Sequence, residues 1–190
     1  FVERVFPVLT PLAVDPGHPF PYISNLSLNL AVWLRSPEDR RTRFARIKAP
    51  YILPRWLQVP NTLRYVPLEE VIAHNLDRLF PGMEVLDTSR FRVTRDADFS
   101  ISDEADDLLG AVEAQLRRRR FGHVVRLEVE ADAPEGLVED LMEALEVTSR
   151  DTFRISPPLD FTSLWMLAGL DRPALRDAPW EPRTRSRLRP

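Results

Sequence analysis

Histidine side chains are the first candidates for chemistry in this sequence, because the chain has no cysteine and only three histidines. They are His18, His74 and His123, and no two of them have the one-turn spacing with which a helix presents paired imidazoles to zinc. His74 is predicted on a helix and His123 at the start of a strand, where a solvated or core-edge histidine is the simpler interpretation. His18 lies in a proline-rich loop, where contact with a ligand is a hypothesis. The residues themselves therefore predict no catalytic, cofactor-binding or metal-binding site.

Carboxylates form a second possible site, just after Ser102. They are Asp103, Glu104, Asp106 and Asp107. A metal site is one hypothesis, but the calcium-loop spacing with its central glycine is missing. The favoured interpretation is the first turn of a helix, where acidic side chains interact favourably with unpaired backbone amides. The run Arg117–Arg120 is expected to close the same helix, where cations offset the exposed carbonyls.

Basic side chains gather on one predicted hairpin. Its five cations are Arg40, Arg41, Arg43, Arg46 and Lys48. Closely spaced cations can attract a polyanion, so contact with a polyanionic ligand is one hypothesis for this hairpin. The alternative interpretation is a solvated edge strand, whose charges discourage pairing with other chains.

Nucleotide-binding motifs are not found. A P-loop needs glycines followed by a lysine, but the only lysine is Lys48, which lies between Ile47 and Ala49. No Gly-x-Gly-x-x-Gly motif occurs, which excludes a Rossmann phosphate turn and a protein-kinase glycine loop. The net charge of −3 and the lack of a recognition motif argue against a nucleic-acid partner.

The composition is that of a folded chain. Of its 190 residues 44% are apolar and 29% charged, and its 18 prolines against 6 glycines favour extended segments with abrupt ends. The chain begins with Phe1 rather than methionine, so we expect it to be a piece of a longer protein. We see no secretion signal and no membrane-spanning run, and the absence of cysteine fits a reducing compartment, so we expect a cytoplasmic protein.

Alternating patterns predict that strands come first. Residues 24–35 alternate, with the leucines from Leu26 to Leu34 and Val32 on one face, which indicates a half-buried strand. Residues 43–49 predict a second strand with Ala45 and Ile47 on one face, and residues 36–39 a turn between the two. A hairpin is the economical interpretation.

Helical periods follow. We predict helices over 67–80, after Ser102, over 134–145 and over 160–170, and strands over 83–95, 124–130 and 152–155. A run of strands comes first, and in the second half of the chain strands and helices alternate. The predicted fold class is therefore α+β, with a mixed, largely antiparallel sheet and helices packed on it.

The most specific pattern is residues 5–32, which read VFPVLTPLAVDPGHPFPYISNLSLNLAV. Five further blocks follow in order, FARIKAP at 44–50, VPLEEVI at 66–72, LFPGMEVL at 79–86, FRVTRDAD at 91–98 and RRFGHVVRLEV at 119–129. Together these blocks closely resemble the bacterial polyphosphate kinase family, in its middle, or head, domain.

The resemblance implies that residues 1–178 are this middle domain and 179–190 a Pro- and Arg-rich linker toward C-terminal catalytic domains. It implies a parent enzyme that uses ATP and magnesium, and that transfers the terminal phosphate of ATP to polyphosphate through a phosphohistidine. That histidine, and the arginines that bind magnesium and phosphate, belong in the family to the C-terminal domains. No catalytic residue is therefore carried over to this sequence, and the fragment alone is expected to be inactive.

The resemblance also implies partners. They are the N-terminal and C-terminal domains of the same parent chain and, in a homo-oligomer, a second copy of it. The domain is expected to act as an interdomain and oligomer scaffold, or alternatively as a polyanion-binding surface that guides polyphosphate along the hairpin cations.

Overall fold

A six-stranded sheet is the centre of the fold in the computed structural model of the chain, which describes residues 1–15, 17–96, 122–178, 180 and 182. The strand order is β1-β3-β2-β6-β7-β8, and every neighbouring pair is antiparallel except β7 and β8, which are parallel. The strands are β1 (Leu12–Val14), β2 (Leu28–Arg35), β3 (Thr42–Lys48), β6 (Glu84–Arg95), β7 (Val124–Glu130) and β8 (Thr152–Ile155). A separate antiparallel pair consists of β4 (Trp56–Gln58) and β5 (Tyr65–Pro67). The predicted α+β class, with its mixed and largely antiparallel sheet, is confirmed.

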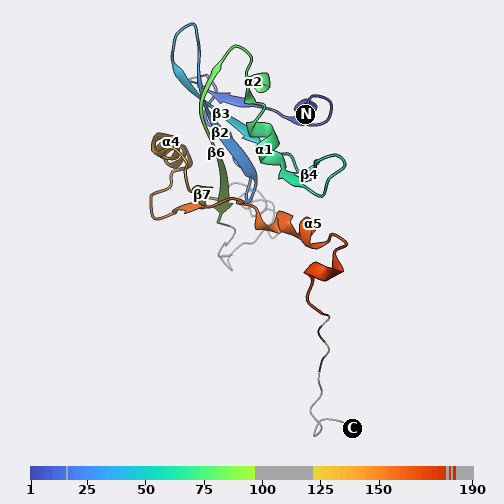
Figure 1. Cartoon of the computed structure of the whole chain (residues 1–190). Helices are drawn as coiled ribbons and strands as arrows, with labels where there is room; N and C mark the ends of the chain where they lie inside the picture. Colours follow the sequence, from blue (N-terminus) through green and yellow to red (C-terminus); the bar gives the residue numbers. More distant parts are fainter. Residues whose placement is uncertain (16, 97–121, 179, 181, 183–190) are drawn as a thin grey trace, which may run out of the picture.

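Helices cover both faces of this sheet. The α-helices are α1 (Leu68–Ala73), α2 (Leu76–Leu79), α4 (Glu135–Leu145) and α5 (Leu164–Ala168), and the 3-10 helices are η1 (Phe6–Val8), η2 (Phe161–Ser163) and η3 (Pro173–Leu175). Figure 1 shows α4 on one side of the sheet and α1 with α2 on the other. Among the described residues, no helix has the length and apolar character needed to cross a membrane.

Some predictions fall on residues that the structure does not describe. They concern the helix after Ser102, the carboxylates Asp103, Glu104, Asp106 and Asp107, and the run Arg117–Arg120. The predicted linker at 179–190 also lies mostly outside the described residues. These remain predictions.

The central strand β2 differs from its prediction as a half-buried strand. It lies between β3 and β6, and both of its faces are covered, so that Leu30 and Ala31 are equally inaccessible to water. The polar residue Asn29 is buried as well, and its Nδ2 donates a hydrogen bond to the Ser27 carbonyl. The prediction was wrong because polar side chains on the second face were taken as solvated, whereas they pair with one another inside the protein.

The helix predicted over 67–80 divides into α1 and α2. The side-chain amide of Asn75 donates to the Val71 carbonyl over 2.8 Å, while the Asn75 backbone N–H goes to the Ile72 carbonyl over 3.0 Å. The side chain thus takes the carbonyl that would continue the α-helix, which is how asparagine interrupts helices. By contrast, the helix predicted over 134–145 is confirmed as α4.

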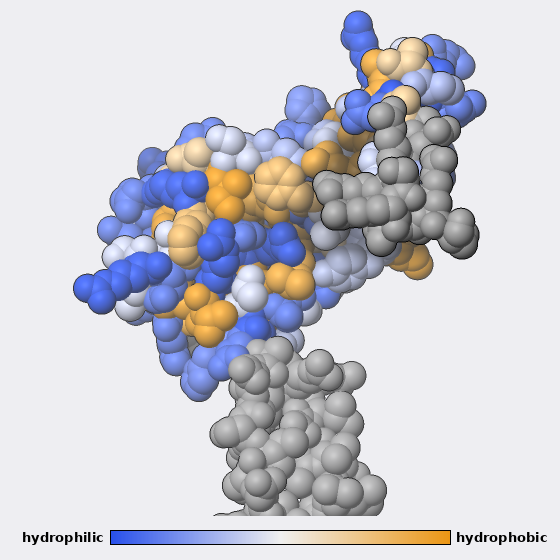
Figure 2. Space-filling model, turned by 90° about the horizontal axis from the view of Figure 1, so that it is seen from below, coloured by the Kyte–Doolittle hydropathy of each residue, from blue (hydrophilic) through white to orange (hydrophobic). Residues whose placement is uncertain are grey.

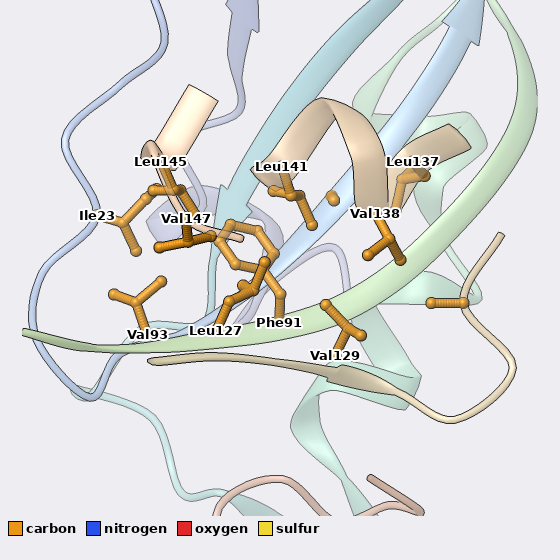
Figure 3. Packing of buried hydrophobic residues seen from close by; sticks show 12 residues of the cluster. Ile23, Phe91, Val93, Leu127, Val129, Leu137, Val138, Leu141, Leu145 and Val147 are labelled. Atoms are coloured by element: carbon orange, nitrogen blue, oxygen red, sulfur yellow. The ribbon is translucent and has the colours of Figure 1, made fainter. Parts of the chain in front are cut away.

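The larger apolar core lies between α4 and the sheet. Figure 3 shows the side chains of α4 pointing toward those of β6 and β7. Its buried members include Phe91 and Val93 of β6, Leu127 and Val129 of β7, and Leu137, Val138 and Leu141 of α4. Each large side chain buried in this way contributes about 1.5–3 kcal/mol to folding.

A second apolar core lies on the opposite face, beneath α1 and α2. Its buried members are Val5, Leu30, Val32, Leu34, Ala45, Ile47, Leu68, Ile72 and Leu76. Strands β2 and β3 therefore contribute to the layers on both sides, and their register, in which Leu30 faces Ile47, fixes the two cores relative to each other.

Trp33 joins α4 to β2. Its Nε1 donates a hydrogen bond to Asp140 Oδ2 over 2.8 Å, and its ring lies against the backbone of Gly136 at the start of α4. A Cβ added to Gly136 would be 2.7 Å from the Cη2 atom of Trp33, which is closer than carbon atoms approach. The glycine therefore makes room for the indole ring.

We expect Gly136→Ala to destabilise the protein for this reason. Alanine normally favours a helix over glycine by about 1 kcal/mol, but the clash with the hydrogen-bonded indole outweighs that gain, for a net loss of about 1–2 kcal/mol. Urea unfolding measures the change. In a Trp33→Leu background the clash is absent, and the same substitution should become neutral or stabilising. An equal loss in both backgrounds would contradict this account of Gly136.

Candidate functional site

The predicted hairpin is confirmed, but its cations do not form one surface. Strand β3 pairs with β2 on one side and β1 on the other, so the interpretation of a solvated edge strand is wrong. Arg40 and Arg41 are exposed in the turn between β2 and β3, and their side chains form no ion pair with the described residues. Arg43 is half-buried and pairs with Asp39 over 2.7 Å.

Arg46 and Lys48 are held inside the fold. Arg46 is only 6% exposed, and its Nε donates to Asn29 Oδ1 over 2.8 Å. The Lys48 ammonium donates to Ser24 Oγ over 3.0 Å and lies 5.2 Å from the centroid of the Tyr51 ring. Burial lowers the pKa of both cations, and for Lys48 the neighbouring Arg46 charge lowers the pKa further. These two cations therefore stabilise the hairpin, whereas Arg40 and Arg41 remain available to a ligand.

All three histidines are exposed, and they lie on separate segments. His18 is in the loop before β2, where its Nδ1 lies 3.0 Å from Asp15 Oδ1. The hydrogen bond with His18 is the main reason why the pKa of Asp15 lies below its usual value, and the Gly17 N–H adds to it. His74 follows α1, and His123 precedes β7. Within the described part of the chain, no three His, Asp or Glu side chains gather in a way that could hold a metal ion.

The most extensive group of charged side chains lies elsewhere, on the face of β6 and β7 that points away from α4. We call it the arginine–carboxylate cluster. It includes residues of α1, of β6, of β7 and of the segments before β4 and η2, namely Arg55, Glu69, Glu70, Arg90, Arg92, Glu128, Glu130 and Asp160.

Arg90 is the centre of this cluster. Its Nη1 donates to both carboxylate oxygens of Glu130, over 2.9 and 3.1 Å, and its Nη2 lies 2.7 Å from Glu70 Oε2. Glu130 is nearly inaccessible, with 5% of its side chain exposed, and it also accepts the backbone N–H of Arg90. One guanidinium thus connects α1, β6 and β7.

Arg55 makes a second connection. Its Nη2 donates to Glu69 Oε2 over 2.8 Å, and its Nε lies 3.8 Å from Asp160 Oδ2. Burial raises the pKa of the Glu69 carboxyl, and the nearby Arg55 charge opposes this rise without cancelling it. Arg55 therefore joins α1 to the segment that precedes η2.

Arg92 completes the cluster by holding that same segment to the sheet. Its Nη1 donates to the Leu159 carbonyl over 3.1 Å and lies 3.8 Å from Glu128 Oε2. Trp56 adds a hydrogen bond from its Nε1 to Ser163 Oγ over 3.1 Å. Residues 159–163 are thus fixed by side chains of β6, of β4 and of the segment before β4.

A small cavity of about 190 Å³ lies within the cluster. Its apolar lining comes from Leu28, Trp56, Pro67, Pro157, Pro158 and Leu159, and its polar lining from Glu69, Glu70, Arg90 and Glu130. The Nε atoms of Arg55, Arg90 and Arg92 are buried without a hydrogen-bond acceptor among the described residues. Because each carboxylate of the cluster lies within ion-pair distance of an arginine on another segment, the arrangement is suited to holding these segments together.

Beside the cluster, large apolar side chains project into solvent. We call this the aromatic surface, and define it by Tyr51, Ile52, Phe161, Trp165 and Met166. The exposed fractions of Ile52 and Trp165 are both 80%, and that of Tyr51 is 66%. Figure 2 shows hydrophobic side chains interspersed with hydrophilic ones on the underside of the molecule.

Sequence reasoning missed the arginine–carboxylate cluster. The signal was present in the alternation of Arg90-Phe91-Arg92-Val93 on β6 and of Leu127-Glu128-Val129-Glu130 on β7. In both strands the apolar residues face α4 and the charged ones face away. Opposite charges on adjacent strands indicate paired rather than solvated side chains.

The fold and this charged face define an α+β domain whose segments are joined by buried ion pairs. A family model described as "Polyphosphate kinase middle domain" matches residues 1–167. The chain belongs to this family.

Relatives named polyphosphate kinase are similar over nearly the whole chain. That of Mycobacterium ulcerans is 50% identical over 195 residues, covering 97% of this chain and 26% of the relative. That of Thermosynechococcus vestitus is 49% identical over 191 residues, covering 96% of this chain and 26% of the relative. The chain thus spans about a quarter of the length of these relatives.

The crystal structure of polyphosphate kinase from Porphyromonas gingivalis is similar in fold. Its TM-score is 0.70 at 24% sequence identity, covering 97% of this chain and 26% of that one. The resemblance inferred from the sequence blocks is therefore confirmed at the level of the family and the fold.

Replacing Arg55 by alanine should make stability depend on pH. Glu69 would remain buried without its guanidinium partner, which should cost about 3 kcal/mol at pH 7. The pKa of Glu69 in the folded state, already raised by burial, would rise further. A carboxyl whose pKa is higher in the folded than in the unfolded state favours folding when protonated, so stability falls as pH rises between those two values. The loss of unfolding free energy caused by Arg55→Ala, measured by urea unfolding, should therefore be smaller at pH 5 than at pH 7.

Arg43→Ala is the matched control, because its ion pair with Asp39 is more exposed to solvent. We expect little loss of stability from it, and no change in that loss between pH 5 and pH 7. If the deficit of Arg55→Ala were the same at both pH values, Glu69 would not be the group responsible.

Proposed function

We propose that this chain is the non-catalytic middle domain of a polyphosphate kinase and acts as a scaffold between the other domains of the longer protein, called the parent below. In this proposal the parent transfers the terminal phosphoryl group of ATP to a histidine, releasing ADP, and then from that histidine to the end of a polyphosphate chain. The histidine, ATP and magnesium are held by other domains, and no residue of this chain is assigned to them.

The observation that carries the proposal is the arginine–carboxylate cluster. Its eight charged side chains join α1, the sheet and residues 159–163. Residues 159–163 lead toward the last described part of the chain. Buried ion pairs contribute little net stability compared with apolar packing, but they favour one geometry over others. A fixed geometry at the point where the chain leaves the domain is what a scaffold between domains requires.

The distribution of the histidines supports the same proposal. A phosphohistidine needs a positioned imidazole with cationic groups around the incoming phosphoryl group. His18 is paired with a carboxylate, and His74 and His123 are exposed at the ends of separate elements. A carboxylate can orient an imidazole for nucleophilic attack, but the exposure of all three rings to solvent and their separation on different segments do not favour a phosphohistidine site.

We expect the parent with His18→Ala, His74→Ala and His123→Ala combined to form phosphohistidine from ATP as the unsubstituted parent does. Acid-labile incorporation of the labelled terminal phosphate measures this, and chain 1–190 alone should incorporate none. Loss of the label in a variant that keeps the unfolding midpoint of the parent would refute the proposal. Turnover of ATP into polyphosphate by chain 1–190 would refute it as well.

A polyanion-binding surface is the second candidate function, and one observation favours it. Arg40 and Arg41 are adjacent, exposed and without an ion pair among the described residues. A cationic turn of this kind attracts polyphosphate in a salt-dependent way. The surface is smaller than the sequence suggested, because Arg46 and Lys48 are engaged within the fold.

Arg40→Ala combined with Arg41→Ala should weaken binding of polyphosphate to the parent by about tenfold at low ionic strength and less at high ionic strength. Titration with a labelled polyphosphate of defined length measures the affinity. The matched control is Arg64→Ala combined with Arg78→Ala, which removes two exposed cations elsewhere. Equal affinity of the two double variants would exclude the turn as a polyphosphate contact.

A further inference from the structure

We infer that the aromatic surface is the docking site of the catalytic domain that follows this one in the same parent polypeptide. This inference rests on the proposed scaffold function and assigns it to particular residues. It concerns Tyr51 and Ile52 before β4 and Phe161, Trp165 and Met166 in and around η2 and α5.

The exposure of these side chains is unusual in extent. Single exposed apolar residues are ordinary on protein surfaces, but several large ones together mark a contact site. Trp165 leaves 80% of its surface in water, Ile52 80%, Tyr51 66% and Phe161 59%. An indole has a polar N–H that water can satisfy, but its remaining surface gains free energy only by being covered.

The residues of the aromatic surface come from two segments that contact each other. The two segments that carry them are bonded through Trp56 and Ser163, and the charge of Asp160 acts on the Tyr51 hydroxyl, whose pKa is raised mainly by burial. Arg92 also acts on Tyr51 and pairs with Glu128, and Glu128 in turn pairs with Arg126.

Arg126 extends this surface to β8. Its guanidinium lies 3.7 Å from the centroid of the Phe153 ring, and Phe153 is 40% exposed. Aromatic side chains, methionine and arginine are enriched in protein interfaces relative to the rest of a protein surface.

The aromatic surface is also held rigidly from behind. Arg55 and Arg92 fix the segment at 159–160, and the hydrogen bond from Trp56 to Ser163 fixes the start of α5. Rigid presentation of contact side chains lowers the entropy lost on association, which favours binding.

A domain of the same polypeptide is the occupant that these observations favour. The relatives are about four times as long as this chain, so the parent has ample sequence for further domains. The surface contains the last α-helix of the described chain, and the residues after it, 171–190, are rich in proline and arginine. A domain of the same polypeptide is present at a high effective concentration, so docking needs only modest contact energy. A second copy of the chain would have no such advantage.

Hydroxyl-radical footprinting of the full-length parent and of chain 1–190 tests this inference. Trp165 should be modified about tenfold more slowly in the parent than in chain 1–190, because a docked domain excludes water from an anchor residue. The buried Phe91 reports in the same samples whether the domain is folded, since it should be protected in both. Equal modification of Trp165 in the two folded samples would overturn the inference. Protection that appears in chain 1–190 as its concentration rises would assign the surface to a second copy and would also overturn it.

Variants of the parent give a second readout that does not require chain 1–190. Trp165→Ala should increase the rate of limited proteolysis in the segment 171–182 about fivefold, because an undocked domain leaves that segment accessible. Leu63→Ala is the matched control, since Leu63 is also largely exposed, 69%, and lies outside both the aromatic surface and the cleaved segment. Equal cleavage rates in both variants and the unsubstituted parent would contradict the inference.

The two proposals can fail separately. The scaffold function fails if the histidine variant loses its phosphohistidine or if chain 1–190 turns over ATP. The docking site fails if Trp165 stays exposed in a parent that still forms phosphohistidine.

Discussion

Burial of both faces of β2 is the constraint on which the rest of this structure depends. One face contributes Leu30, Val32 and Leu34 to the core under α1 and α2, and the other contributes Ala31 and Trp33 to the core under α4. Because side chains alternate along a strand, a shift of one residue would exchange the two sets and place Asn29 in an apolar layer. The register of β2 with β3 and β6 therefore fixes both layers, and with them the position of every segment that carries a candidate functional residue.

The arginine–carboxylate cluster shows how this domain fixes α1 to the neighbouring strands of its sheet. Apolar residues at these positions would give at least as much stability, because burying an arginine and a carboxylate costs desolvation that their attraction only partly repays. What the pairs add is geometry. Arg90 meets Glu130 through two hydrogen bonds and Glu70 through an ion pair, so α1 has one preferred position relative to β6 and β7. The segment at 159–163 is held by the same means, and the aromatic surface is the outer side of that arrangement.

The sequence predicted the main elements well where one period dominates a long segment, as for α4 and for the hairpin of β2 and β3. It failed where a single side chain decides, as at Asn75, whose amide takes a carbonyl from the helix. It also failed where polarity suggested solvent, since Asn29 and Arg46 satisfy each other inside the fold. The arginine–carboxylate cluster could not be predicted as a unit because its members come from five separate stretches of the chain. Alternation could show that Arg90 and Glu130 share a face, but only the strand order shows that these faces are adjacent.

The edges of the sheet have a consequence for association. Among the strands that the structure describes, one edge is β1, with three residues, and the other is β8, with four. Edge strands this short offer few unpaired backbone groups, and short edge strands are one way in which natural sheets avoid pairing edge to edge into aggregates. These two edge strands therefore offer few backbone hydrogen-bonding groups to which a strand of another polypeptide could be added. Recognition must come from side-chain shape and chemistry, and it can accordingly be altered by point substitutions without disturbing the backbone ladder.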